Sequence, residues 1–211
     1  MRILSVGDIH TKIWVIDKIV EIMDNYDHIV FCGDFVDDWS SLPTKSLDTW
    51  HRMKRLIDDN PDKVHITIGN HDYAYIHQEI AGHSSGWNPI TYTMINTPEN
   101  KYLKDWLLAL PVVIELDGVT FSHAGITENW NGEFDVFSLW DNNSPIWARP
   151  EGTKYKKIKQ VMGHTPQLTC NKIEPNIWFI DTFSTYRDGL PIGDQTVLEI
   201  IDGEQFNKVM L

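Results

Sequence analysis

Acid, amide and imidazole side chains follow short apolar runs directly at five places in this chain. Each run has the length and composition of a buried strand, and each leads into side chains that can bind metal ions or move protons. Open α/β sheets bind ligands at the carboxyl ends of their strands, so these side chains are expected to meet at one sheet edge. The five junctions are Gly7-Asp8-Ile9-His10, Gly33-Asp34-Phe35-Val36-Asp37, Gly69-Asn70-His71-Asp72, Ser122-His123-Ala124-Gly125 and Gly163-His164-Thr165.

Together the junctions supply a mixed oxygen and nitrogen ligand set. Such a set is too rich in imidazole for calcium or magnesium alone and suits Mn²⁺ first, with Fe or Zn²⁺ as alternatives. Asp8 and His10 are two residues apart, so on extended chain their side chains leave the same face and can bind one ion together. We expect Asp34 to bridge that ion to a second one. The predicted metal ligands are Asp8, His10, Asp34, Asn70, His123 and His164.

Two divalent cations in this arrangement are suited to phosphoryl transfer. At a separation of roughly 3.5–4 Å, both cations neutralise the phosphoryl oxygens while a bridging hydroxide attacks phosphorus in line. The leaving oxygen then needs a proton, and His71, beside the predicted ligand Asn70, is expected to supply it as the general acid. An imidazolium in this position needs a carboxylate that orients it and raises its pKa, and Asp37 is the candidate.

The first half of the chain alternates between strands and amphipathic helices. Apolar residues recur with helical spacing from Ile13 to Met23, through Ile16, Ile19 and Val20. The glycine- and serine-rich stretch 81–96 predicts a loop near the site. The predicted strands are Arg2–Val6, His28–Cys32 and Val64–Ile68, and the other predicted helices are Lys45–Asp58, Tyr73–Ile80 and Asn100–Ala109.

The second half predicts an antiparallel pattern. Asp117-Gly118 lies between two short apolar runs and is typical of a two-residue type I′ hairpin turn. Asp202-Gly203 joins the last two runs in the same way. The predicted strands are Val112–Leu116, Val119–Ser122, Gln160–Met162, Ile177–Asp181, Thr196–Ile201 and Gln205–Met210.

Length and composition limit the possible function classes. With 211 residues, the chain is expected to form a single domain over residues 1–211. A formal charge of −12 argues against a nucleic-acid-coating protein, although a nucleotide substrate stays open. Cys32 and Cys170 are expected to be reduced thiols. With no basic leader and no long apolar segment, the sequence predicts a soluble cytoplasmic protein that makes no contact with membranes.

The five junctions resemble, in order, the motifs of the calcineurin-like metallophosphoesterases, from Ile3 to about Asp181. Gly163-His164-Thr165-Pro166 lacks the second His found in diesterase branches, so the chain is most similar to the small bacterial and bacteriophage-type phosphoprotein phosphatases. The resemblance implies an α/β fold, a four-layer α/β/β/α sandwich of two mixed sheets flanked by helices. It also implies a dimetal phosphatase in which Asp37 is the partner of His71.

One position departs from the resembled pattern. The subfamily usually has Arg directly after the Asp37 position, and that Arg binds the substrate phosphate, whereas this chain has Asp38 followed by Trp39. An acid there is expected to repel a phosphate dianion. Arg149 resembles the other arm of the usual phosphate clamp, and its guanidinium is suited to bidentate phosphate contact.

The leading functional hypothesis is hydrolysis of phosphomonoesters, either phosphorylated proteins (phosphoserine, phosphothreonine or phosphotyrosine) or small molecules. A phosphodiesterase or a nucleotide pyrophosphohydrolase is the alternative, which Asp38 favours because a diester carries less charge. A third hypothesis is a catalytically inactive binding module. The loop tryptophans Trp39, Trp87, Trp140 and Trp147 fit local packing better than a rim for a ring-bearing substrate.

Overall fold

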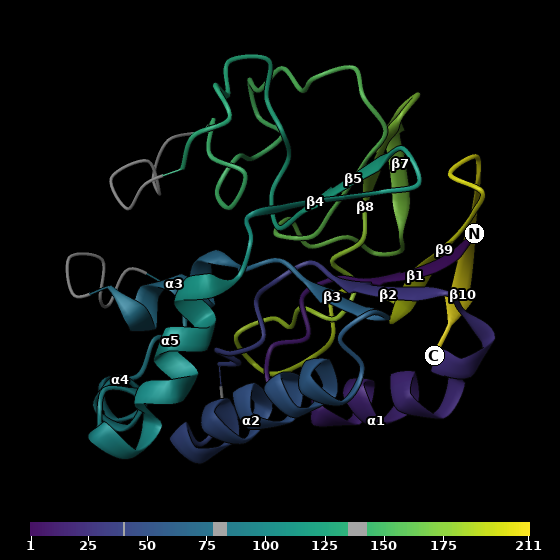
Figure 1. Ribbon diagram of the computed structural model, residues 1–211. Helices are drawn as coiled ribbons and strands as arrows, with labels where there is room; N and C mark the ends of the chain where they lie inside the picture. The colour runs from purple at the N-terminus through teal and green to yellow at the C-terminus, as the bar shows by residue number, and fades with distance from the viewer. Residues whose placement is uncertain (40, 78–83, 135–142) are drawn as a thin grey trace.

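The computed structural model describes residues 1–39, 41–77, 84–134 and 143–211. Two mixed sheets of five strands pack face to face, and the described helices lie on the side of the first sheet (Figure 1). The predicted two-sheet α/β architecture is therefore confirmed. Among the described residues, no helix is long and apolar enough to cross a membrane.

The first sheet contains the early strands of the chain at its centre and the last two at one edge. Its order is β10-β9-β1-β2-β3, in which β1, β2 and β3 are parallel and β9 runs antiparallel to both neighbours. The parallel strands are short and mostly buried, as βαβ units require. The bounds are β1 (Arg2–Val6), β2 (His28–Phe31), β3 (Val64–Ile66), β9 (Thr196–Ile201) and β10 (Gln205–Met210).

The second sheet has the order β4-β5-β6-β8-β7. Its central strands β5, β6 and β8 are parallel, which corrects the expected antiparallel pattern. Only the edge strands β4 and β7 are antiparallel to their neighbours, and the exposed, polar β7 escaped prediction because it has no apolar face. The bounds are β4 (Val113–Leu116), β5 (Val119–Ser122), β6 (Gln160–Met162), β7 (Asn171–Glu174) and β8 (Ile177–Phe179).

The β4–β5 hairpin has the predicted turn geometry. Asp117 has a φ of 52° and Gly118 a φ of 73°, so both central residues are left-handed as a type I′ turn requires. The β9–β10 turn repeats the arrangement, with a φ of 51° at Asp202 and 61° at Gly203. In both hairpins, the Asp-Gly pair is sufficient to predict the turn type.

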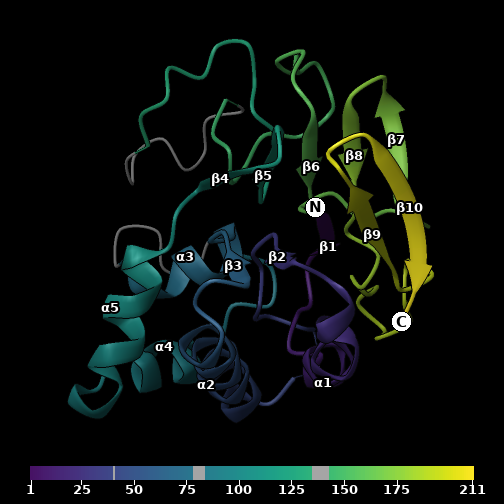
Figure 2. The ribbon, with the colours of Figure 1, turned by 45° about the vertical axis from the view of Figure 1, so that its right-hand side comes forward.

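Helices α1 and α2 cover the outer face of the first sheet, whereas α3, α4 and α5 lie beyond its β3 edge (Figures 1 and 2). The expected buried stripe of α1 is present except at Val20, which is half exposed. Helix α4 corrects the predicted loop 81–96 over residues 89–95, whereas residues 81–83 of that stretch lie outside the described residues. Asn88 caps α4 by accepting hydrogen bonds from the backbone of Ile90 and Thr91, and Pro89 begins it. The bounds are α1 (Ile13–Ile22), η1 (Met23–Asn25), α2 (Pro43–Asp59), α3 (Asn70–Ile76), α4 (Pro89–Ile95), η3 (Pro98–Asn100) and α5 (Lys101–Ala109).

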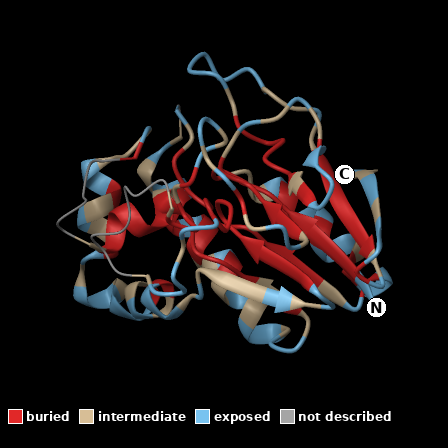
Figure 3. Ribbon diagram, turned by 90° about the horizontal axis from the view of Figure 1, so that it is seen from above, coloured by how far each residue is buried: buried red, intermediate tan, exposed pale blue. Residues whose placement is uncertain are grey.

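Apolar side chains from both sheets meet in a buried cluster between them. Most residues of the central strands are buried (Figure 3). Ile3, Val30 and Leu198 enter the cluster from the first sheet, and Phe121 and Val161 from the second. Each of these five side chains is fully buried. The cluster sets the distance between the sheets, and therefore between the strand ends that bear the functional side chains.

Truncating one side chain of this cluster should lower the free energy of unfolding. Leu198→Ala removes a fully buried side chain between the sheets and is expected to cost about 2–5 kcal/mol. Leu168→Ala is the matched control, because Leu168 is 73% exposed and its truncation should change stability by less than about 0.5 kcal/mol. Guanidinium unfolding monitored by circular dichroism measures both. Equal midpoints for the two variants would contradict the packing described here.

Candidate metal centre

The six parallel strands point their carboxyl ends at one place, and each is followed by a side chain that can bind metal. Asp8 and His10 follow β1, Asp34 follows β2 and Asn70 follows β3. His123, His164 and Asp181 follow β5, β6 and β8. All seven are buried, and several of them line a cavity of about 220 Å³. The structure thus brings together all six predicted ligands and adds Asp181.

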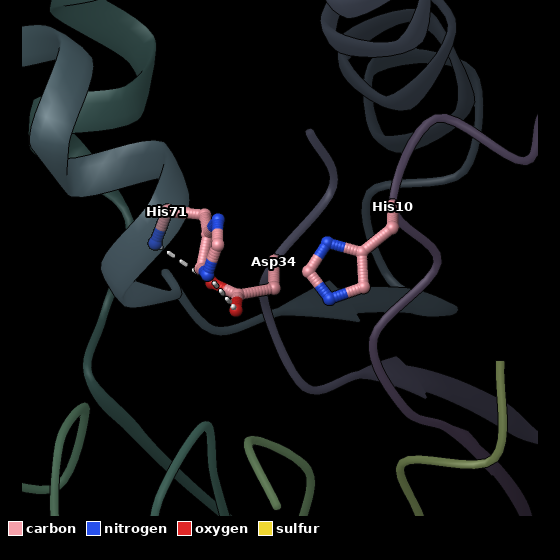
Figure 4. Close-up of side chains that lie close together, drawn as sticks. All are labelled: His10, Asp34 and His71. Carbon is pink, nitrogen blue, oxygen red and sulfur yellow. Dashed lines mark hydrogen bonds and ion pairs between the residues drawn. The ribbon is translucent and has the colours of Figure 1, made fainter. Parts of the chain in front are cut away.

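Two groups of ligand atoms share the Asp34 carboxylate. Atoms of His10, Asp34 and His71 lie within 4.8 Å of one another, and so do atoms of Asp34, His123 and His164. Figure 4 shows the first group, with the rings of His10 and His71 on either side of Asp34. Asp8 is close to it, with 3.9 Å between its Oδ2 and Nε2 of His10. A carboxylate between two groups is the arrangement expected of a bridging ligand.

His123 provides a test of whether these residues fit a cation. Its Nδ1 lies 2.8 Å from the carbonyl oxygen of Cys32, which can only accept, so Nδ1 donates and, in the neutral tautomer that a metal ligand needs, Nε2 carries a lone pair. That Nε2 faces Asn70 Oδ1 at 2.9 Å, His164 Nδ1 at 3.0 Å and Asp34 Oδ2 at 3.3 Å. Lone-pair atoms that converge in this way need a positive charge among them, so the residues fit a bound divalent cation.

Two further imidazoles have ring nitrogens suited to a metal. Nε2 of His164 is buried and has no hydrogen-bond partner within the described ranges. His10 donates from Nδ1 to the carbonyl of Val36 at 2.8 Å, which leaves its Nε2 lone pair free. Backbone carbonyls that fix the donor nitrogen and turn the other one inward are the usual support of histidine ligands.

The pKa values of Asp8 and Asp34 are shifted in opposite directions. Burial raises the pKa of Asp8 well above its usual range, and Asp181 and Asp34 raise it further. Burial by itself would also raise the pKa of Asp34, but His123 and His71 outweigh it and lower that pKa overall. Carboxylates packed this closely favour the binding of positive charge.

Several non-glycine residues at the site have left-handed backbones. The φ angles are 41° at His10, 52° at Asp34, 66° at Asp37 and 63° at His164. Such conformations cost energy and cluster at functional sites, where the surrounding structure imposes them. The fold therefore places these side chains at the expense of local backbone preference.

Glycines next to the ligands allow the strand ends to approach one another. A Cβ on Gly69 would lie 2.1 Å from Asp34 Oδ1, and one on Gly163 would lie 1.9 Å from Asp8 Oδ1. No side chain fits at either position. Gly69 and Gly163 thus each make room for a candidate ligand of another junction.

His71 and Asp37 form the predicted pair beside the ligand groups. His71 Nδ1 lies 3.2 Å from Asp37 Oδ2, and the His71 backbone N–H donates to Asp34 Oδ1 at 2.9 Å. Burial would lower the pKa of His71, but Asp34 and the hydrogen bond to Asp37 outweigh it and raise the pKa to about 9. The imidazole ring of His71 is therefore positively charged, with a proton on each nitrogen, at neutral pH.

Two hydroxyl groups hold Asp37 in place, and sequence reasoning missed both. Tyr75 Oη donates to Asp37 Oδ1, and Ser84 Oγ donates to Asp37 Oδ2 at 2.7 Å. Tyr75 also accepts a hydrogen bond from the backbone of Asn88 at 2.8 Å, which links Asp37 to the start of α4. No sequence motif marks Tyr75 or Ser84, because their partner is more than 30 residues away.

Asp181 was detectable from the sequence. It follows an apolar run, Ile177 to Ile180, as each other junction does. The side chain is buried, accepts hydrogen bonds from the backbone N–H and hydroxyl of Ser184, and lines the cavity. Asp181 was absent from the predicted ligands because Ile177–Asp181 was predicted only as a strand of the sheet.

The remaining predicted residues have different places. Arg149 is exposed and lines the cavity, as a phosphate contact requires. Trp39 also lines the cavity, whereas Trp87 stacks on Tyr75 with 6.0 Å between ring centroids. The ring of Trp147 lies beside the ring of His164, with 5.7 Å between the two centroids. Trp140 lies outside the described residues.

The family model of the calcineurin-like phosphoesterases matches residues 1–189. Among curated proteins, the symmetrical bis(5'-nucleosyl)-tetraphosphatase of Vibrio cholerae is 28% identical over 114 residues, which are 54% of this chain and 39% of that protein. The protein of the same name from Chromobacterium violaceum is 26% identical over 138 residues, 62% of this chain and 45% of that protein. The chain spans less than half the length of these two relatives.

Solved structures share the fold over almost the whole chain. A cold-active protein-tyrosine phosphatase from a psychrophilic Shewanella species has a TM-score of 0.67 at 17% identity, covering 99% of this chain and 80% of that one. A protein serine/threonine phosphatase from Saccharomyces cerevisiae has a TM-score of 0.68 at 11% identity, and the match covers 100% of this chain and 80% of that one. At these identities the likeness concerns the fold.

Replacing the shared carboxylate should cost the protein its metal. Asp34→Asn keeps the size of the side chain and tolerates the left-handed backbone, but it removes the charge between the two ligand groups. We expect the metal bound per protein after dialysis against Mn²⁺ to fall strongly, as measured by inductively coupled plasma spectrometry. Asp37→Asn is the matched control, because Asp37 also has a positive φ but belongs to neither group of ligand atoms and contacts only Nδ1 of His71 there. Full metal content in Asp34→Asn would contradict the bridging role.

Proposed function

Because the chain belongs to the calcineurin-like phosphoesterase family, we propose that it is a dimetal-dependent phosphatase that hydrolyses phosphomonoesters. The observation that carries the proposal is the convergence of Asn70, Asp34 and His164 on the lone pair of His123. These converging atoms suit a bound cation. His71, next to Asn70 in the chain, has a raised pKa and can therefore donate a proton. The substrate is a phosphorylated protein or small molecule.

The site residues divide into those that hold cations and those that act on substrate. Asp8, His10, Asp34, Asn70, His123 and His164 would hold two divalent cations, with Mn²⁺ as our first expectation. When bound, such cations neutralise the phosphoryl oxygens and lower the pKa of a water molecule. Arg149, at the cavity wall, is proposed to contact the phosphate with its guanidinium.

His71 is proposed as the general acid. Its Nε2 points toward the ligand groups, 3.8 Å from Asp34 Oδ2, while Nδ1 is held by Asp37. A protonated ring in this orientation donates its Nε2 proton to the leaving oxygen as the bond to phosphorus breaks. Asp37, fixed by Tyr75 and Ser84, keeps the ring turned toward the cavity.

Nucleotide pyrophosphohydrolysis is the second candidate. The curated relatives from V. cholerae and C. violaceum bear the name bis(5'-nucleosyl)-tetraphosphatase, and the region they share with this chain exceeds half of it. Turnover of p-nitrophenyl phosphate, bis(p-nitrophenyl) phosphate and diadenosine tetraphosphate at one Mn²⁺ concentration separates the candidates. Fastest turnover of the first substrate supports our proposal, whereas fastest turnover of either of the others replaces it.

His71→Asn should separate proton donation from metal binding. We expect full metal content but a kcat lowered by roughly 10²–10⁴-fold, the usual contribution of a general acid. The loss should be large for phenyl phosphate, whose leaving oxygen needs a proton, and small for 2,4-dinitrophenyl phosphate, whose leaving group is stable as an anion. A loss of equal size on both substrates would contradict the general-acid role. No turnover of any ester by the metal-loaded wild type would favour an inactive binding module instead.

A further inference from the structure

Asp38, which stands where the resembled phosphatases have a phosphate-binding Arg, is already paired. Its Oδ2 lies 3.2 Å from Nζ of Lys12, and its Oδ1 accepts a hydrogen bond from Thr185 at 2.8 Å. The side chains of Asp38 and Lys12 are only 18% and 15% exposed, so the pair is shielded from solvent. The expected repulsion of a phosphate dianion is therefore largely neutralised, and Asp38 instead links the loop after β2 to the loop after β8.

This link places Trp39 at the cavity. Trp39 directly follows Asp38, is 45% exposed and lines the cavity that also contains the ligand carboxylates. Pro166 and Ile192 line the same cavity. The cavity thus combines charged side chains with apolar and aromatic surface. A phosphate group alone needs only the charged side chains.

Arg187 brings positive charge to the indole of Trp39. Its guanidinium carbon lies 5.6 Å from the centroid of the Trp39 ring. The loop that carries Arg187 is closed by hydrogen bonds between Tyr186 and Leu190 and between Ile192 and Ser184, at 2.8 and 2.9 Å. A cation over one face orients the indole and favours contact with further aromatic rings and with anionic groups. In a chain of formal charge −12, a cation beside this acidic cavity is well placed for an anionic ligand.

We propose that Trp39 and Arg187 form a subsite for an aromatic ring carried by the phosphoester substrate. The ring stacks on the indole of Trp39, and the Arg187 guanidinium contacts the ring or a neighbouring phosphate. The subsite rests on the proposed function, because it requires the phosphate to lie at the ligand groups. It deepens that function by assigning the substrate class: aryl or nucleoside phosphates in preference to alkyl phosphates of equal charge.

Calorimetric binding to the Mn²⁺-loaded protein tests the subsite without turnover. Benzylphosphonate and cyclohexylmethylphosphonate have the same charge and similar size and differ in ring aromaticity. We expect benzylphosphonate to bind more tightly to the wild type, and Trp39→Ala to weaken benzylphosphonate binding by roughly 5–150-fold, the range seen when stacking aromatic residues are truncated. Trp39→Phe should keep most of the preference, since a stacking face remains. Arg187→Gln, which leaves the indole intact, should reduce the preference by a smaller factor.

Trp130 offers a matched control. Its indole is also partly exposed and also has a cation over it, Lys156 Nζ at 5.7 Å, but Trp130 does not line the cavity within the described part of the chain. Trp130→Ala should leave both dissociation constants unchanged. An equal loss in Trp130→Ala and Trp39→Ala would overturn the subsite.

A second ligand pair identifies the source of the ring. Adenosine 5'-(α,β-methylene)diphosphate is compared with methylenediphosphonate, which lacks the nucleoside. Loss of the nucleoside's contribution in Trp39→Ala assigns the subsite to nucleobases, and loss confined to benzylphosphonate assigns it to small aryl groups. Phosphonate binding without any preference for rings refutes the subsite but keeps the proposed function. Absence of all phosphonate binding to the Mn²⁺-loaded protein refutes both.

Discussion

Buried like charge is the constraint on which this structure depends. Asp8, Asp34 and Asp181 lie in one solvent-poor volume where the two sheets meet, and burial together with the neighbouring carboxylates raises the pKa values of Asp8 and Asp181. Placing such groups together is unfavourable unless positive charge compensates. The protonated ring of His71 supplies part of the compensation, and the inward-facing lone pairs of neutral imidazoles create a place for cations. The architecture of two sheets with converging parallel strands is what makes this concentration of ligands possible.

The left-handed residues and close glycines follow from the same constraint. Six strand ends can meet only if their backbones approach more closely than side chains allow, so Gly69 and Gly163 stand directly against ligand carboxylates. Residues that must point inward from tight turns accept positive φ angles, as His10 and Asp34 do. The His71–Asp37 pair belongs to this system as well, because the His71 backbone binds the same Asp34 that lies between the ligand groups.

The wall of the cavity departs from the resembled phosphatases, whereas its floor does not. Asp38 neutralises Lys12 and holds Thr185, so a position expected to contact phosphate has become a link between two loops. The candidate metal ligands and the proposed proton donor follow strand ends, whereas the proposed ring subsite lies on loops. A family can therefore keep one chemistry while its substrates change.

The sequence by itself determined the parallel strands of the first sheet, both Asp-Gly turns and the strand-end positions of the six candidate ligands, because apolar runs followed by polar groups are local patterns. The two-sheet class followed from the resemblance to a known family. The sequence did not determine the parallel pairing of β5, β6 and β8, since direction depends on partners brought together by folding. It missed α4, whose cap at Asn88 and Pro89 was readable but lay in a glycine-rich stretch. Tyr75, Ser84, and the pairing of Asp38 with Lys12 were decided only by tertiary structure. Each of these is a contact between residues more than 20 positions apart, and no local pattern encodes such a contact.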